Sequence, residues 1–150
     1  MRPEDQYHVG IVVNDLDAAK EFYSLSAGYR WCDEMRIENV FVNGDQETAV
    51  SLRFTYSQEA PHIELVESIP GSLFAASSPN LHHVGYWSDD IEADSARLTE
   101  NGYLNEAVGC DADGNPYWAY HKSSTGPRIE IVSRALEPAL QSYWDTGPIG

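Results

Sequence analysis

An internal repeat constrains the fold of this chain more than any other feature of its sequence. Residues 8–29 read HVGIVVNDLDAAKEFYSLSAGY, and residues 83–103 read HVGYWSDDIEADSARLTENGY. The two segments align with one deletion. Both begin with HVG, have an aspartate at the end of the strand-like segment that follows (Asp15 and Asp90) and end with Gly-Tyr. Such a repeat indicates one supersecondary unit that occurs twice and buries its apolar face together with its copy.

Each copy of the repeat predicts a short strand followed by a helix. Asp15 and Asp90 stand at the positions expected for helix N-caps. Gly28 and Gly102 stand where each helix should end. Further strands are expected over residues 40–42, 49–54, 63–66, 118–120 and 129–132, with Asn-Gly-Asp at 43–45 as a turn signal. Each half is therefore predicted to fold as β-α-β-β-β.

The expected fold class is α+β, with two tandem βαβββ modules in one domain. Module 1 spans about residues 6–68 and module 2 about residues 81–134. The Pro- and Gly-containing stretch at about 69–80 connects them. In the tail at 135–150, residues 137–143 are expected to add a short helix.

The charge of the chain excludes several classes of partner. The 24 acidic residues outnumber the 9 basic ones and give a net charge of −15, which repels nucleic acids and anionic membrane surfaces. The apolar run at 9–13 is too short to span a membrane, and the N-terminus does not resemble a signal peptide. Cys32 and Cys110 form no CxxC motif. A cytoplasmic protein that acts on a small molecule is expected.

Strand alternation places four chemically active side chains on one face. In the strands that begin at His8 and His83, the histidine points away from the face that Val9 and Val84 present to the helices. In the strands at 63–66 and 129–132, Glu64 and Glu130 likewise oppose the isoleucines. Each half thus contributes one histidine and one glutamate to the same face.

These four residues predict a metal site. Carboxylates flanked by Ile and Leu on strands are rarely buried without a partner, because an unpaired buried charge is costly. A divalent cation satisfies both glutamates and both imidazoles and leaves positions for water or substrate, as in catalytic sites. Four unrelated side chains are the alternative, which the symmetry of the repeat disfavours.

The repeat and its four residues resemble the vicinal oxygen chelate superfamily, which includes glyoxalase I, methylmalonyl-CoA epimerase, extradiol dioxygenases and bleomycin-resistance proteins. The resemblance covers the chain up to about residue 133. It implies a curved mixed sheet around a metal-containing cavity, with His8, Glu64, His83 and Glu130 as ligands of Co, Ni, Zn or Mn. Exposed sheet edges commonly pair two chains in this superfamily, so a homodimer is expected.

Within this superfamily, the short sequence motifs of the chain are most similar to those of the epimerases. IELVE at 63–67, LHHV at 81–84 and HKSSTG at 121–126 resemble segments of those enzymes. The resemblance implies proton removal next to a carbonyl through a metal-stabilised enediolate, by an isomerase, epimerase or lyase. Glu47 and Glu130 match the catalytic acid–base pair of the epimerases, although Glu47 is equally interpretable as a solvated turn residue.

Two features depart from the epimerase pattern. Strand alternation puts Trp87 on the face of His83, and Phe54, Trp118 and Tyr120 lie on nearby strands, so a flat or hydrophobic substrate is expected in the pocket. Few basic residues are available to hold an anionic thioester. Two alternatives therefore stay open. One is an extradiol-type dioxygenase with Fe(II) and an aromatic substrate, which a fourth ligand disfavours. The other is a non-catalytic binding or resistance protein.

Overall fold

The order of secondary structure repeats once along the chain. A computed structural model describes residues 1–43, 46–77, 81–124 and 126–146, and between residues 39 and 49 it describes the backbone alone. The elements are β1 (Gln6–Val13), α1 (Leu16–Ala27), β2 (Met35–Asn43), β3 (Gln46–Tyr56), β4 (His62–Glu67), β5 (Leu81–Ser88), α2 (Ile91–Glu100), β6 (Leu104–Cys110), β7 (Pro116–Lys122), β8 (Arg128–Ser133) and α3 (Glu137–Thr146). The predicted α+β class is confirmed, and β6 is a strand that the sequence patterns did not indicate.

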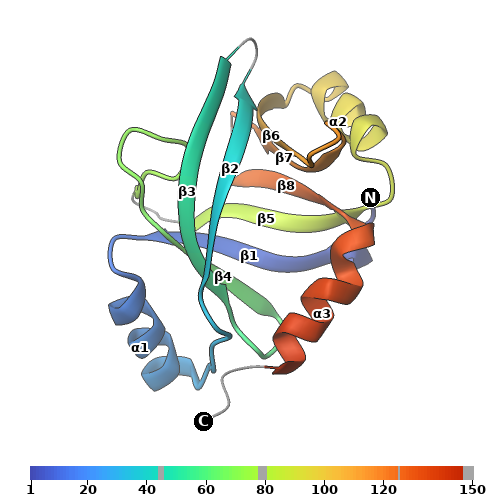
Figure 1. The fold of residues 1–150 in the computed structure, drawn as a ribbon. Helices are drawn as coiled ribbons and strands as arrows, with labels where there is room; N and C mark the ends of the chain where they lie inside the picture. Colours follow the sequence, from blue (N-terminus) through green and yellow to red (C-terminus); the bar gives the residue numbers. More distant parts are fainter. Residues whose placement is uncertain (44–45, 78–80, 125, 147–150) are drawn as a thin grey trace.

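The eight strands form one mixed sheet that closes into a barrel. Their order is β1-β4-β3-β2-β6-β7-β8-β5. The pairs β1–β4 and β5–β8 are parallel, and the other neighbours are antiparallel. The two repeats therefore join where β1 meets β5 and where β2 meets β6. Figure 1 shows β8, β5, β1 and β4 side by side across the middle of the molecule.

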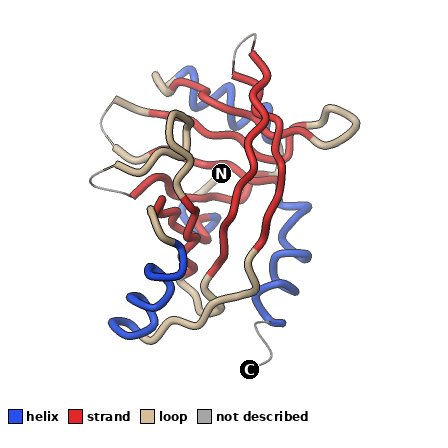
Figure 2. Tube along the Cα trace, turned by 60° about the vertical axis from the view of Figure 1, so that its left-hand side comes forward, coloured by secondary structure: helices blue, strands red, loops and turns tan. Residues whose placement is uncertain are grey.

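The helices lie at the periphery of the barrel (Figure 2). Helix α1 buries Leu16 against Leu65 of β4, and α2 buries Ile91 against Ile131 of β8. The predicted N-caps are confirmed: the Asp15 side chain accepts a hydrogen bond from the Ala18 amide at 2.9 Å, and Asp90 makes the equivalent bond. In the described residues, no helix has the length and apolar character to cross a membrane.

Helix α3 packs against one end of the barrel (Figure 1). Its Trp144 is buried and stacks on His62 with ring centroids 3.9 Å apart. The Tyr143 hydroxyl donates to the carbonyl of Asp33. The sequence predicted a helix over 137–143, and the observed helix extends to Thr146. These contacts fix α3 as a wall of the interior rather than a loose tail.

Candidate metal centre and cavity

The glycines of the two HVG motifs make room for the two histidines. In the antiparallel pairing of β1 with β5, His8 lies opposite Gly85 and Gly10 lies opposite His83. A Cβ atom on Gly85 would lie 1.9 Å from Cε1 of His8, and a Cβ on Gly10 would lie 1.9 Å from Cε1 of His83. Each motif therefore supplies one imidazole and the space for the imidazole of the other motif.

The glutamates reach the same point from the neighbouring parallel strands. Glu64 of β4 is in register with Gly10, and Glu130 of β8 is in register with Gly85. Their carboxylates therefore extend over the glycines toward the histidine pair. All four side chains lie inside the barrel, and each residue is at most 7% exposed.

The donor atoms of these four residues converge. The Nε2 atoms of His8 and His83 lie 2.9 Å apart. Oε2 of Glu130 is 3.0 Å from His8 Nε2 and 3.3 Å from His83 Nε2. Oε2 of Glu64 is 3.1 Å from His83 Nε2 and 3.7 Å from His8 Nε2. One donor atom from each residue lies within 4.8 Å of all the others.

This arrangement fits a divalent cation. Donor atoms bound at about 2.1 Å from one ion are separated by about 3.0 to 3.4 Å, depending on the coordination geometry. Oε2 of Glu64 and Oε2 of Glu130 are buried, and apart from the clustered imidazoles the described residues offer them no hydrogen-bond donor of good geometry. Two imidazole nitrogens and two carboxylate oxygens are also a donor set that first-row metals accept. The four residues can therefore hold such an ion, and their assignment as ligands stays a prediction.

Without a cation the cluster is held together by charge. Burial lowers the pKa of the His83 imidazole, but the charges and hydrogen bonds of Glu130 and Glu64 outweigh it and raise that pKa to about 9. Burial raises the pKa of Glu130, but the charge of His83 and hydrogen bonds from both histidines hold it well below its usual range. In the metal-free cluster the positive charge of the His83 imidazolium therefore offsets the negative charge of Glu130.

The neighbouring His82, which is not one of the four clustered residues, orients the ring of His83. His82 Nε2 lies 2.9 Å from the Leu73 carbonyl, which can only accept, so this nitrogen carries the proton. His82 Nδ1 lies 2.9 Å from His83 Nδ1. Burial and the neighbouring His83 lower the pKa of His82 to about 3, so the neutral ring accepts at Nδ1. His83 then donates from Nδ1, so Nε2 is the ring nitrogen that a metal ion would bind in place of a proton, the arrangement common in metal-bound histidines.

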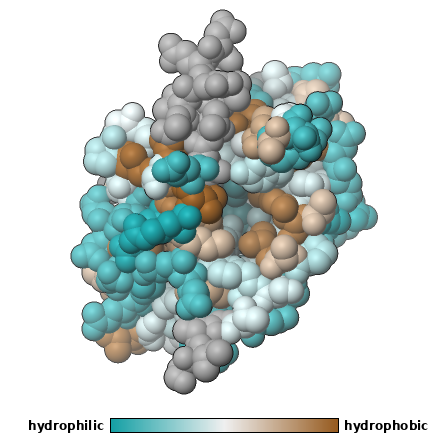
Figure 3. Space-filling model, in the orientation of Figure 1, coloured by the Kyte–Doolittle hydropathy of each residue, from teal (hydrophilic) through white to brown (hydrophobic). Residues whose placement is uncertain are grey.

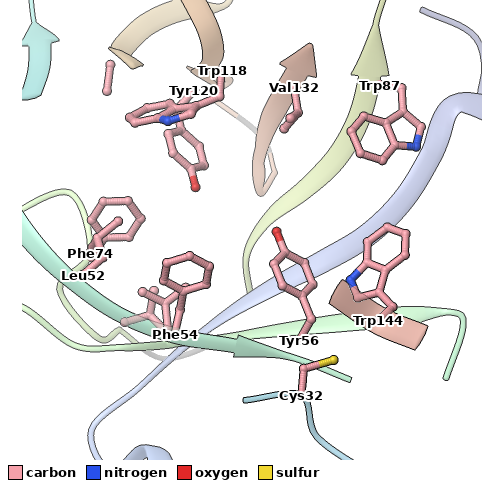
Figure 4. Close-up of a cluster of buried hydrophobic side chains, with 13 residues drawn as sticks. Cys32, Leu52, Phe54, Tyr56, Phe74, Trp87, Trp118, Tyr120, Val132 and Trp144 are labelled. Atoms are coloured by element: carbon pink, nitrogen blue, oxygen red, sulfur yellow. The ribbon is translucent and has the colours of Figure 1, made fainter. Parts of the chain in front are cut away.

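Beside the cluster lies a cavity of about 140 Å³ with an apolar wall. It is lined by Tyr7, Met35, Ile37, Leu52, Phe54, Tyr56, Glu64, Val66, Phe74, Tyr117, Trp118, Tyr120, Glu130, Val132, Leu136 and Leu140. In Figure 4, Trp118 and Tyr120 of β7 face Phe54 and Tyr56 of β3 across the interior. The structure thus brings the predicted pocket residues Phe54, Trp118 and Tyr120 together with both glutamates.

Two buried tyrosines, Tyr56 and Tyr120, and the partly buried Tyr7 give the cavity neutral hydrogen-bond donors. Desolvation, followed by the charges of Glu130 and Glu64, raises the pKa of Tyr7 and of Tyr120 well above 10. Tyr56 behaves in the same way. These phenols stay protonated at neutral pH, so they can donate hydrogen bonds to a substrate but cannot act as bases.

One predicted pocket residue, Trp87, lies elsewhere, and the prediction for Glu47 stays open. Trp87 does not line this cavity: its ring stacks on Tyr7 with centroids 3.8 Å apart. It lines a separate hollow of about 480 Å³ beside His8, His62 and Trp144. Strand alternation correctly predicted that Trp87 lies on the same face of β5 as His83. It could not show that the ring of Tyr7 would pack against Trp87. The backbone of Glu47 pairs with Val42, and its side chain lies outside the described residues.

Several residues of the site were not identified as such from the sequence. Leu136 and Leu140 reach the cavity from the C-terminal segment, which lies outside both repeats. His82 was noted only within a motif, although two adjacent histidines before the HVG glycine are a usable signal for a supported ligand. Tyr7 precedes His8 as His82 precedes His83, so the repeat could have indicated it.

A family model and a curated protein match the chain. Residues 7–117 match the family model of the glyoxalase/bleomycin resistance protein/dioxygenase superfamily. A relative from Bacillus subtilis (strain 168), the uncharacterized protein YwbC, is 26% identical over 131 residues, which cover 85% of this chain and 95% of YwbC.

Solved structures share the fold at low sequence identity. A methylmalonyl-CoA epimerase of Streptomyces coelicolor, in complex with 2-nitronate-propionyl-CoA, superposes with a TM-score of 0.56 at 21% identity and covers 87% of this chain and 97% of the epimerase. The Mycobacterium tuberculosis epimerase gives 0.57 at 22% identity, covering 91% of each chain. A hypothetical protein of Bacillus halodurans C-125 gives 0.59 at 18% identity, covering 86% of this chain and 93% of that protein.

Proposed function

Because the chain belongs to the glyoxalase/bleomycin resistance protein/dioxygenase superfamily, we propose that it is a divalent-metal-dependent enzyme. The reaction is proton removal and return at a carbon next to a carbonyl, as in an isomerase, epimerase or lyase. One observation carries the proposal: two histidines and two glutamates from both repeats bring their donor atoms within 4.8 Å of one another in the barrel interior.

The metal would be held by His8, Glu64, His83 and Glu130. When bound, a divalent cation polarises a carbonyl oxygen and stabilises the negative charge that develops on it as the α-proton leaves. The protein's own part is to exclude water with the apolar wall and to direct Nε2 of His83 toward the site. His82 supports the second task, since it accepts the Nδ1 proton of His83.

Glu130 is the described residue best placed to move the proton. Its carboxylate lines both the donor cluster and the cavity, so it can contact a substrate carbon without leaving the site. Its pKa is held low, and thus it is ionised before the reaction. Once the proton has left, the α-carbon is planar. We assign proton transfer on its other face to Glu47, as the epimerase resemblance implies. The protonated phenol of Tyr120 supplies a neutral donor beside them.

A second candidate function is an Fe(II)-dependent dioxygenase with an aromatic substrate, because aromatic side chains line much of the cavity wall. Three protein ligands and several open positions are the usual arrangement for oxygen chemistry on Fe(II). Here four donor atoms converge, which favours the proton-transfer reaction. A non-catalytic binding protein is the third reading, and it requires no metal in the site.

Metal analysis of the purified protein distinguishes these readings. One equivalent of Co, Ni, Zn or Mn supports the proposal, one equivalent of ferrous iron with oxygen uptake supports the dioxygenase, and no metal supports the binding protein. A His83→Ala, Glu130→Ala double variant should bind no metal. His121→Ala is the matched control, because His121 is equally buried but bonds to Ser95 on the outside of the sheet. Metal retained in the double variant contradicts the site.

The reaction itself is tested by solvent exchange. A panel of 2-hydroxy ketones in deuterium oxide should include a compound that gains deuterium at its α-carbon only with the metal-loaded protein. Exchange should disappear in Glu130→Gln. In Glu47→Gln, exchange on one face should persist while inversion of configuration is lost. If Glu47→Gln leaves inversion unchanged, Glu47 has no part in the reaction.

A further inference from the structure

Among the side chains that the structure describes, the cavity wall carries no charge apart from the candidate ligands, and the side chain of Glu47 lies outside that set. Of the sixteen side chains that line it, fourteen are aliphatic or aromatic, and the other two are Glu64 and Glu130. A bound divalent cation balances these two carboxylates. Ile37, which lines the cavity, is 39% exposed, so the cavity reaches the surface. Figure 3 shows a hollow in one face of the molecule with hydrophobic side chains on both sides of it. A charged substrate group would lose its hydration here and find no described side chain of opposite charge on the wall, only the neutral tyrosine hydroxyls.

The basic side chains of the protein are engaged elsewhere. Seven of the nine form ion pairs with carboxylates, and all nine belong to the described part of the chain. Arg53 contacts Glu34 and Glu67, and Arg134 contacts Asp5 and Asp89.

The other two, Arg36 and Lys122, are exposed on β2 and at the end of β7. Arg36 alternates with Met35 and Ile37, which line the cavity, so it lies on the outer face of β2. The described residues thus form no basic cluster at the cavity to bind the phosphates of a coenzyme A carrier.

The size of the cavity limits the substrate further. An apolar protein cavity of about 150 Å³ holds one benzene molecule. The cavity here, at about 140 Å³, has room for one group of that size. Leu136 and Leu140 contribute to the wall from the C-terminal segment, and Trp144 and Tyr143 fix that segment to the barrel.

We infer that the substrate is a compact, uncharged molecule in which two adjacent oxygens carry one apolar group about the size of a six-membered ring. The two oxygens rest on the proposed function, whereas the size and the neutrality rest on the cavity alone. A coenzyme A thioester, as bound by the Streptomyces coelicolor epimerase, lies outside this class.

Hydroxamates test the inference, because they offer two adjacent oxygens without being turned over. Benzohydroxamate and acetohydroxamate differ only in the ring. In calorimetric titrations of the cobalt-loaded protein, benzohydroxamate should bind at least tenfold more tightly. Malonyl-CoA should show no saturable binding at concentrations that saturate the protein with benzohydroxamate. Equal affinities of the two hydroxamates, or tighter binding of malonyl-CoA, would overturn the inference.

Variants of the cavity wall test whether the preference for benzohydroxamate arises in this cavity. Leu140→Trp should weaken benzohydroxamate at least tenfold and leave acetohydroxamate unchanged. Leu25→Trp is the matched control, since Leu25 is 80% exposed on α1 and should change neither affinity. If Leu140→Trp does not fold, Leu140→Ala serves instead, and it should bind 2-naphthohydroxamate at least tenfold more tightly than the wild type does. Unchanged selectivity in a folded Leu140 variant contradicts the assignment of the cavity.

The failures of the two proposals are distinguishable. Cobalt bound with no preference for the ring refutes the inference and leaves the proposed function intact. If the protein binds none of Co, Ni, Zn and Mn, the proposed function fails, and toluene tests the cavity in the metal-free protein. A rise in melting temperature with toluene then supports the apolar cavity, and an unchanged melting temperature refutes it.

Discussion

Replacing Gly85 by alanine tests whether the two HVG motifs build the metal site together. The new Cβ would lie 1.9 Å from Cε1 of His8, whereas ordinary contact begins at 3.4 Å, so the ring must retreat by about 1.5 Å. His8 is only 2% exposed and cannot swing into solvent. Metal–ligand distances tolerate about 0.2 Å. The substitution should therefore remove His8 from the donor set although it changes no ligand.

The expected magnitudes follow from this displacement. Overpacking costs about 1–3 kcal/mol, which lowers the melting temperature of a chain of this size by roughly 2–12 °C. Cobalt at 100 times its Kd should stabilise the wild type by about 2.7 kcal/mol. A loss of affinity of at least 10- to 100-fold reduces this stabilisation to about 1.4 kcal/mol or less in Gly85→Ala. Thermal unfolding with and without cobalt measures both effects.

A second glycine provides the matched control. A Cβ on Gly109 would lie 2.1 Å from Cε2 of Trp118, a comparable overlap away from the four donors. Gly109→Ala should lose similar stability and keep the stabilisation by cobalt. Gly126→Ala, whose nearest atom is 3.9 Å away, should change neither. If Gly85→Ala binds one cobalt with wild-type affinity, the reciprocal packing of the motifs does not determine the site.

Three further predictions address the support of the site. His82→Phe keeps an aromatic ring beside Phe74 but removes the hydrogen-bond acceptor for Nδ1 of His83. The affinity for cobalt, measured by competition with a chelator, should therefore fall by about 10- to 100-fold. An unchanged affinity would show that His82 does not orient His83 for metal binding. In the metal-free protein, the raised pKa of His83 stabilises the fold fully below about pH 6.5 and ceases to do so as the pH rises through about 9. Urea unfolding should therefore show falling stability over that interval, and a rise would contradict the charge assignment. Trp144→Ala should cost about 3–5 kcal/mol in the same assay, because Trp144 is buried and stacked on His62; a cost below about 1 kcal/mol would show that α3 does not close the barrel.

The sequence was informative wherever a pattern is local or repeated. Strand alternation depends on neighbouring residues alone, so the shared face of His8 and Glu64 could be predicted, and the repeat doubled that evidence with His83 and Glu130. The helix caps at Asp15 and Asp90 were equally local. The strand β6 was missed, because its segment contains Asn, Glu and Gly and shows neither a clear alternation nor an apolar run.

The two repeats, most of their elements and the four inward-facing residues could thus be predicted from local patterns. How those four residues meet depends on the tertiary structure. The pairing of β1 with β5 sets each histidine over the glycine of the other motif, and packing between distant segments places Tyr7 against Trp87 and α3 against the barrel. The size and neutrality of the cavity follow from that packing. They depend on contacts between residues far apart in the chain, which no local pattern encodes.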